Sequence, residues 1–98
     1  MEEGKHLIAG DWVSGEEGRF ENMPVDGAAG HFPVGTAAHV DQAVQAAERA
    51  FPSSAAQSRS DRATLLRTIA REIDARGERI TEIGTRETGL PAARLEGE

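Results

Sequence analysis

Glu87-Thr88-Gly89-Leu90-Pro91 is the stretch that punctuates this chain most sharply. Glycine ends helices because it adopts the left-handed conformation without strain, and a proline shortly afterwards prevents the helix from continuing. Proline is also well tolerated where a new helix begins. The stretch therefore predicts that one helix closes here and that another opens at Ala92, still incomplete at Glu98. We expect the 98 residues to be the front piece of a longer polypeptide.

Upstream of this stretch, apolar side chains recur every three or four residues, the period of an amphipathic helix. They predict helices at about 37–51, 59–76 and 78–88, followed by the start of a fourth. The side chains that we expect to pack in the intact protein are Val40, Val44, Ala47, Phe51, Leu66, Ile69 and Ile73.

The ends of these helices carry recognisable signals. Thr36 and Ser58 are predicted N-caps, and Asp61 lies three residues after Ser58 as a capping box requires. Pro52 should end the first helix, and Gly77 should be the C-cap of the second. Glu72 and Arg76 stand four residues apart, the spacing of an ion pair on one helix face.

Short apolar clusters separated by turn residues fill residues 6–35 and predict short β-strands. Leu7-Ile8-Ala9 and Trp12-Val13 form a candidate hairpin with Gly10-Asp11 as its two-residue turn. Phe20 begins a second extended piece. His31-Phe32-Pro33-Val34-Gly35 is a third, and Pro33 places it at a sheet edge because proline donates no ladder hydrogen bond.

Composition limits what the chain does alone. Leu, Ile, Val and Phe supply only 18 of 98 residues, which is thin for an independent core. The net charge of −6 argues against binding to nucleic acid or to an anionic membrane, and no apolar run has the length of a membrane span. Cysteine is absent, so this chain has no disulfide and no thiolate. A cytoplasmic location is the default expectation.

No motif in the chain predicts a catalytic, cofactor-binding or metal site. His6, His31 and His39 lack metal-ligand spacing, so only long-range folding could join them at a metal ion. Gly84 and Gly89 do not form a phosphate-binding loop. Close helix packing explains Gly84 better. The arginines of residues 37–98 lie among acids and read as solvated ion pairs. Trp12 suits strand-face packing better than a role as a partner anchor.

Five segments in order resemble the N-terminal part of the NAD(P)-dependent aldehyde dehydrogenase superfamily. They are the opening hairpin at 7–13, Phe20 with the Pro24-Val25-Asp26-Gly27 turn, the helix at 40–51, Arg62-Ala63-Thr64-Leu65-Leu66-Arg67, and residues 87–91. Leu90 stands where most members have lysine, the segment before Pro24 is shorter than usual, and Ser54 stands where an aromatic residue is common. Residues 6–10 and 90–98 look most like the subgroup that oxidises 2-oxoglutarate semialdehyde (2,5-dioxopentanoate).

The resemblance implies an α/β parent several times longer, with a Rossmann-like cofactor domain, a catalytic domain and a strand used in oligomerisation. Residues 1–98 would be the incomplete N-terminal portion of the cofactor-binding domain, with strands and turns at 1–36 and helices at 37–98. In the family a Cys thiolate attacks the aldehyde, hydride passes to NAD or NADP, and a Glu-activated water releases the acid. None of these residues lies here, so the resemblance assigns no catalytic residue to this chain.

The implied partners are the remainder of the enzyme chain, a small aldehyde, and further copies in a dimer or tetramer. The role of the segment would be that of a scaffold, inactive when isolated. Two alternatives remain open. One is an acidic helical adaptor that binds a partner through an apolar stripe, and the other is a truncated relic without activity.

Overall fold

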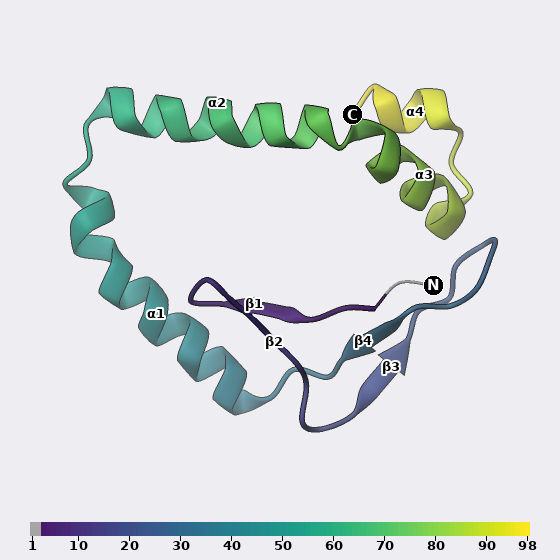
Figure 1. Cartoon of the computed structure of the whole chain (residues 1–98), viewed down its shortest axis with the longest axis horizontal. Coiled ribbons are helices and arrows are strands. Elements are labelled where there is room, and N and C mark those ends of the chain that lie inside the picture. Colours follow the sequence, from purple (N-terminus) through teal and green to yellow (C-terminus); the bar gives the residue numbers. More distant parts are fainter. Residues whose placement is uncertain (1–2) are drawn as a thin grey trace. The chain divides into compact units, whose positions relative to one another are not determined.

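The computed structural model describes residues 3–98 as four short strands followed by four helices (Figure 1). The strands are β1 (His6–Ile8), β2 (Asp11–Val13), β3 (Arg19–Glu21) and β4 (His31–Pro33). The helices are α1 (Ala37–Ala55), α2 (Arg59–Ala75), α3 (Gly77–Thr88) and α4 (Ala92–Glu96). The predicted division into a strand region and a helical region is confirmed.

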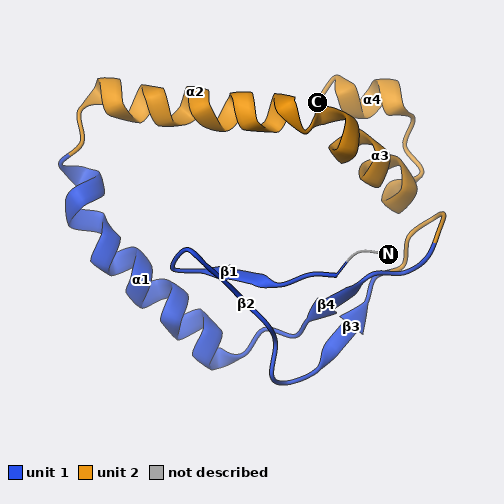
Figure 2. Ribbon diagram, viewed as in Figure 1, with its two compact units in different colours: residues 1–22, 28–56 blue, residues 23–27, 57–98 orange. Residues whose placement is uncertain are grey.

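The elements gather into two compact units (Figure 2). The first unit comprises the chain up to Asn22 and Ala28–Ala56, so it holds all four strands and α1. The second comprises Gln57–Glu98 together with the short segment Met23–Gly27. That segment leaves the first unit and donates two backbone hydrogen bonds to the end of α3, from Val25 N to Glu87 O at 3.3 Å and from Asp26 N to Arg86 O at 3.0 Å.

The strands form two separate antiparallel pairs, β1 with β2 and β3 with β4. The first hairpin is confirmed, but its predicted turn is wrong by one residue. Ile8 pairs with Asp11, so the turn residues are Ala9 and Gly10, both with positive φ (53° and 86°). Positive φ at both positions is what the type I′ hairpin turn requires, and Asp11 is thereby freed to join the strand.

The second pair places Phe20 opposite Phe32 and Arg19 opposite Pro33. The two phenyl rings contact each other with centroids 5.9 Å apart. Because the sheet has only two strands, each strand is an edge, and the predicted edge position of Pro33 is confirmed.

Both predicted helix N-caps are confirmed. The Ser58 hydroxyl accepts from Asp61 N at 3.0 Å, and Asp61 Oδ2 accepts from Ser58 N at 3.3 Å. The Thr36 hydroxyl accepts from His39 N at 3.1 Å, and His39 Nδ1 accepts from Thr36 N at 3.2 Å. The second capping box was missed in the sequence because its third residue is His39 rather than the usual Glu or Gln.

Replacing Ser58 by Ala should reduce the stability of α2 by about 1 kcal/mol, because the N–H of Asp61 loses its acceptor. The expected result is a lower helix content by circular dichroism. Ser58→Asp is the matched control, since an aspartate caps as well as a serine. Equal helix content in Ser58→Ala and the native chain would contradict the capping role.

Two predicted helix ends differ from the structure. The first helix does not stop at Phe51 but continues through Pro52 to Ala55. Pro52 lies within the last turn, so it removes only one intrahelical donor, and Ala56 N still reaches Pro52 O at 3.2 Å. Gly77 is not a C-cap: α2 ends at Ala75 with Arg76 as its C-cap, and Gly77 is the first residue of α3.

The end of α3 and the beginning of α4 agree with the sequence. Gly89 has φ 74° and its N–H donates to Thr85 O at 2.8 Å, as a left-handed cap does. The new helix opens at Ala92 and its last helical residue is Glu96, two residues short of the predicted extent. A Cβ on Gly84 would lie 2.9 Å from a Leu95 methyl group, which confirms that Gly84 permits close packing of α3 and α4.

Candidate functional site

A shallow apolar groove runs along α2 and α3 within the second unit. It has a volume of about 340 Å³ and is lined by Thr68, Ile69, Glu72, Ile73, Arg76 and Ile80. Helical spacing creates it, because Ile69, Ile73 and Ile80 repeat on one side of two consecutive helices. We refer to these six residues as the α2–α3 groove.

The isoleucines of the groove are strongly exposed: Ile69 is 46% exposed, Ile73 55% and Ile80 49%. Covering an aliphatic side chain of this size contributes about 1.5–3 kcal/mol. Because about half of each of these three side chains remains in water, roughly half of that stabilisation is not realised among residues 3–98. Their exposure makes the groove a surface fitted for contact with further polypeptide.

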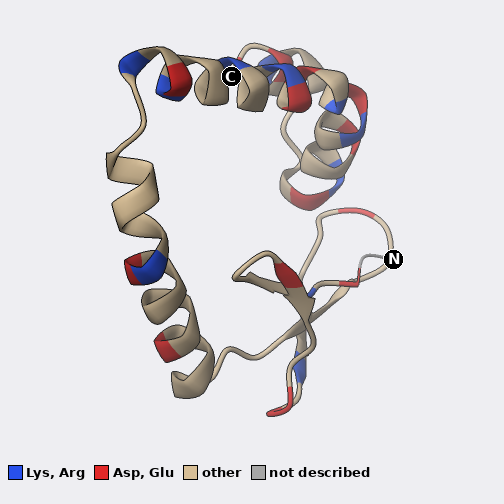
Figure 3. Ribbon diagram, turned by 60° about the vertical axis from the view of Figure 1, so that its left-hand side comes forward, with Lys and Arg blue, Asp and Glu red and all other residues tan. Residues whose placement is uncertain are grey.

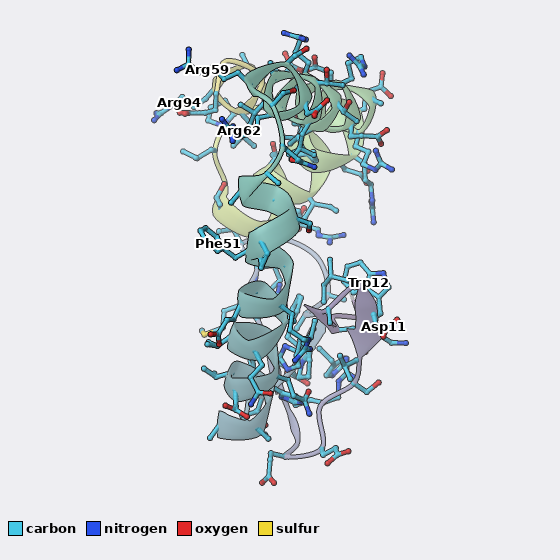
Figure 4. The ribbon with its side chains drawn as sticks, turned by 90° about the vertical axis from the view of Figure 1, so that its left-hand side faces the viewer. Asp11, Trp12, Phe51, Arg59, Arg62 and Arg94 are labelled. Atoms are coloured by element: carbon cyan, nitrogen blue, oxygen red, sulfur yellow. The ribbon has the colours of Figure 1, made fainter. Side chains whose placement is uncertain are left out.

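The apolar stripe of α1 is exposed as well. Val40, Val44 and Phe51 are all more than half exposed, and Figure 4 shows Phe51 projecting outward from the helix. Across residues 3–98 no apolar side chain other than that of Pro33 reaches the burial typical of a protein core. The sequence predicted these stripes correctly, but the described chain holds nothing that covers them.

Charged residues of both signs are interspersed along the helices (Figure 3). Arg76 pairs with Glu72 one turn earlier, as the spacing predicted. Arg79 Nη1 lies 3.0 Å from Glu82 Oε2, and Arg94 Nε lies 3.2 Å from Glu98 Oε1. These side chains are more than half exposed, so the prediction of solvated ion pairs is confirmed for these three arginines, and each pair contributes little.

The histidines divide into two places in the first unit. The rings of His6 and His39 contact each other, with centroids 4.7 Å apart, a proximity that their sequence separation did not reveal. His31 lies instead between two carboxylates, those of Glu3 and Glu21. Among residues 3–98, no three histidine or acidic side chains gather closely enough to hold a metal ion. The predicted absence of a metal site stays a prediction.

Trp12 does not pack on a strand face as predicted. It pairs across the hairpin with Leu7, yet Trp12 is 68% and Leu7 60% exposed. A pair of strands has no second layer of its own, so the face of the hairpin that carries Leu7 and Trp12 stays largely in water. Figure 4 shows Trp12 on β2 beside Asp11, at the surface of the first unit.

Helix N-termini can bind phosphates through free backbone N–H groups. Within residues 3–98 the N-termini of α1 and α2 are capped by Thr36 and Ser58, whereas α3 begins without a side-chain cap. The prediction that no cofactor-binding or catalytic residue lies in this chain stays a prediction, and no reaction step is assigned to these side chains.

The arrangement around His31 was missed in the sequence analysis. Glu21 is the residue opposite His31 in the β3–β4 pair, so the cross-strand register brings the two together. The register could be read only after the strand boundaries were known. Glu3 joins them because the segment before β1 forms a parallel bridge with His31.

No helix within residues 3–98 has both the length and the apolarity needed to span a bilayer.

Comparison with known proteins identifies the family of the chain. Residues 12–98 match the model of the aldehyde dehydrogenase family. The chain is 38% identical over 101 aligned positions to alpha-ketoglutaric semialdehyde dehydrogenase 2 of Azospirillum brasilense. It is 36% identical over 101 positions to alpha-ketoglutaric semialdehyde dehydrogenase of Acinetobacter baylyi.

A more distant relative is 3-succinoylsemialdehyde-pyridine dehydrogenase of a Pseudomonas species, at 33% identity over 91 positions. The two alpha-ketoglutaric enzymes each align with 97% of this chain, and the Pseudomonas enzyme with 90%. The chain spans only about a fifth of these relatives, 19% of each. Since the family match and the two nearly complete alignments agree, the chain belongs to the aldehyde dehydrogenase family.

Proposed function

We propose that this chain is the N-terminal scaffold of a longer NAD(P)-dependent aldehyde dehydrogenase, which we call the parent. The observation that carries the proposal is the exposure of the apolar stripes of α1 and α2, including the α2–α3 groove, in a chain of this family. Further polypeptide of the parent would cover these stripes. The segment would contribute to the fold of the parent and supply none of the reacting groups.

The parent would oxidise an aldehyde to a carboxylic acid. Bound NAD or NADP would accept the hydride. The nucleophilic thiolate of the proposed reaction would also come from elsewhere in the parent, since this sequence has no cysteine. The parent would act as a homo-oligomer.

The proposed substrate is alpha-ketoglutaric semialdehyde, which is 2-oxoglutarate semialdehyde. Its support is the similarity to two relatives that carry this substrate in their names. Other relatives, at 35–38% identity, are named N-succinylglutamate 5-semialdehyde dehydrogenases, so N-succinylglutamate 5-semialdehyde is the competitor to compare.

The test is a spectrophotometric assay of the parent with each semialdehyde and with NAD or NADP. We expect reduced cofactor to accumulate, with alpha-ketoglutaric semialdehyde giving the higher kcat/KM. The isolated 98-residue chain is the control and should produce none. A parent that oxidises neither compound, or an isolated chain that oxidises either, would contradict the proposal.

The adaptor alternative depends on the same α2–α3 groove. It differs in requiring that the 98 residues fold and bind a partner without any further chain. An isolated chain that melts cooperatively as a monomer would favour the adaptor over the scaffold.

A further inference from the structure

A second pocket of the second unit joins the α2–α3 groove to α4. It has a volume of about 430 Å³ and lies between the end of α2, the first turn of α3 and the end of α4. It shares Ile73 and Ile80 with the groove, and Leu95, Glu96 and Glu98 form its other wall. The groove and the pocket are therefore one continuous surface, bordered by α4.

The direction of α4 leads along this surface. Figures 1 and 3 both show the end of the chain beside α2, and in Figure 1 α4 runs in the opposite direction to α2. The part of α2 that lines the groove extends from Thr68 to Arg76, about 12 Å of helix. About eight further helical residues after Glu98 would be long enough to cover it.

The backbone is still helical where α4 ends. Gly97, the residue after α4, has φ −80° and ψ −10°, in the right-handed helical region. Glu98 N donates to Leu95 O at 3.2 Å, and Glu98 Oε1 accepts from Arg94 Nε at 3.2 Å, across one helical turn. The end of α3 is different, because Gly89 closes that helix with φ 74°. The conformation after α4 therefore allows the helix to continue in the same direction.

The surface also specifies the chemistry of a segment that would cover it. The residues that line the pocket include four acidic ones and no basic one, and the acidic residues are Asp74, Glu78, Glu96 and Glu98. Ile73, Ile80 and Leu95 supply its aliphatic part. A complementary segment needs an apolar stripe for the aliphatic side chains and a lysine or arginine for the carboxylates.

We propose that in the parent the residues following Glu98 continue α4 as an amphipathic helix, which lies antiparallel to α2 in the α2–α3 groove. The inference rests on the proposed function, because it requires a parent, and it names the segment that covers the groove. Helical spacing places the apolar stripe of this segment about four, seven and eleven residues after Leu95. A lysine or arginine in its first two turns would face Asp74 and Glu78.

The sequence of the parent beyond Glu98 checks the chemistry of the segment. We expect aliphatic residues at most of the stripe positions and at least one basic residue beside them. A proline within the first two turns, or acidic residues along the stripe, would overturn the proposal.

Cross-linking in the parent tests where the segment lies. Ile69→Cys is combined with a cysteine at the seventh residue after Leu95, which the continued helix would place on the groove side. A short bifunctional thiol reagent should join the two, and mass spectrometry of the digested protein identifies the linked peptides. Arg67→Cys with the same second cysteine is the matched control, because Arg67 lies about 200° around α2 from Ile69. Equal yields from the two pairs would overturn the proposal.

Thr68→Cys is a second groove variant, which guards against misfolding caused by the loss of Ile69. Thr68 lines the same groove, and cysteine is close to threonine in size. This variant should form the same cross-link. Its failure to do so in a folded parent would overturn the proposal.

The reactivity of the single Ile69→Cys thiol separates this inference from the proposed function. In a parent that covers the groove, this thiol should react with a maleimide at least about ten-fold more slowly than the Arg67→Cys thiol. Slow reaction without the cross-link would leave the scaffold proposal standing and overturn the choice of covering segment. Fast reaction would overturn both.

Discussion

Ile69→Ala should lower the free energy of unfolding of the parent by about 2–5 kcal/mol, the range for removing a buried aliphatic side chain. In the isolated chain, where Ile69 is 46% exposed, the same substitution should leave the helix content almost unchanged. A large effect in the parent beside a small one in the isolated chain would show that the parent covers this side chain. Urea denaturation of the parent and circular dichroism of the isolated chain are the two measurements.

The control for this substitution is Arg67→Ala, two residues earlier on the same helix. Arg67 is exposed, and truncating it should change the stability of the parent by no more than about 0.5 kcal/mol. If Ile69→Ala is as harmless in the parent as in the isolated chain, the α2–α3 groove is not covered, and the scaffold proposal is wrong.

Gly89→Ala should destabilise the parent by about 1–2 kcal/mol. Gly89 has φ 74°, and a residue with a Cβ pays roughly this amount in the left-handed region. The added Cβ would lie 3.4 Å from Val25 Cγ1, so the cost arises from backbone conformation and not from a severe clash. Chemical denaturation of the purified variant is the measurement.

Gly89→Asn is the matched variant, because asparagine tolerates the left-handed conformation better than alanine does. It should lie between the native protein and Gly89→Ala in stability. If all three unfold at the same denaturant concentration, the positive φ at position 89 does not limit the choice of residue there.

The elements that the sequence predicted best are those with signals confined to a few neighbouring residues. Ser58 and Asp61 form a capping box within four positions, and Gly89 caps α3 within its own last turn. Amphipathic spacing predicted α1 and α2, because the pattern lies wholly within each helix even though it extends over a dozen or more residues. These signals need no knowledge of the rest of the fold.

The errors arose where a residue is compatible with two local structures. Pro52 was expected to end α1, yet a proline in the final turn removes a single donor and the helix continues to Ala55. Gly10 suits either position of a two-residue turn, and only the pairing of Ile8 with Asp11 fixes which one it occupies. Gly77 likewise suits the end of α2 or the beginning of α3.

The contacts of His31 with Glu3 and Glu21 lay beyond sequence reasoning for a different reason. Glu3, Glu21 and His31 are brought together by strand register and by a bridge from the segment before β1. Nothing in their spacing marks them as neighbours. The α2–α3 groove could be predicted as two stripes, but its exposure became evident only from the absence of a core among residues 3–98.

The most direct test of the scaffold proposal is a thermal melt of the isolated 98-residue chain, followed by far-ultraviolet circular dichroism. If the helix stripes need further polypeptide to cover them, the signal should decline gradually, without a cooperative transition. A sharp, reversible transition of a monomer would contradict the proposal, because it would show that these residues stabilise their own fold.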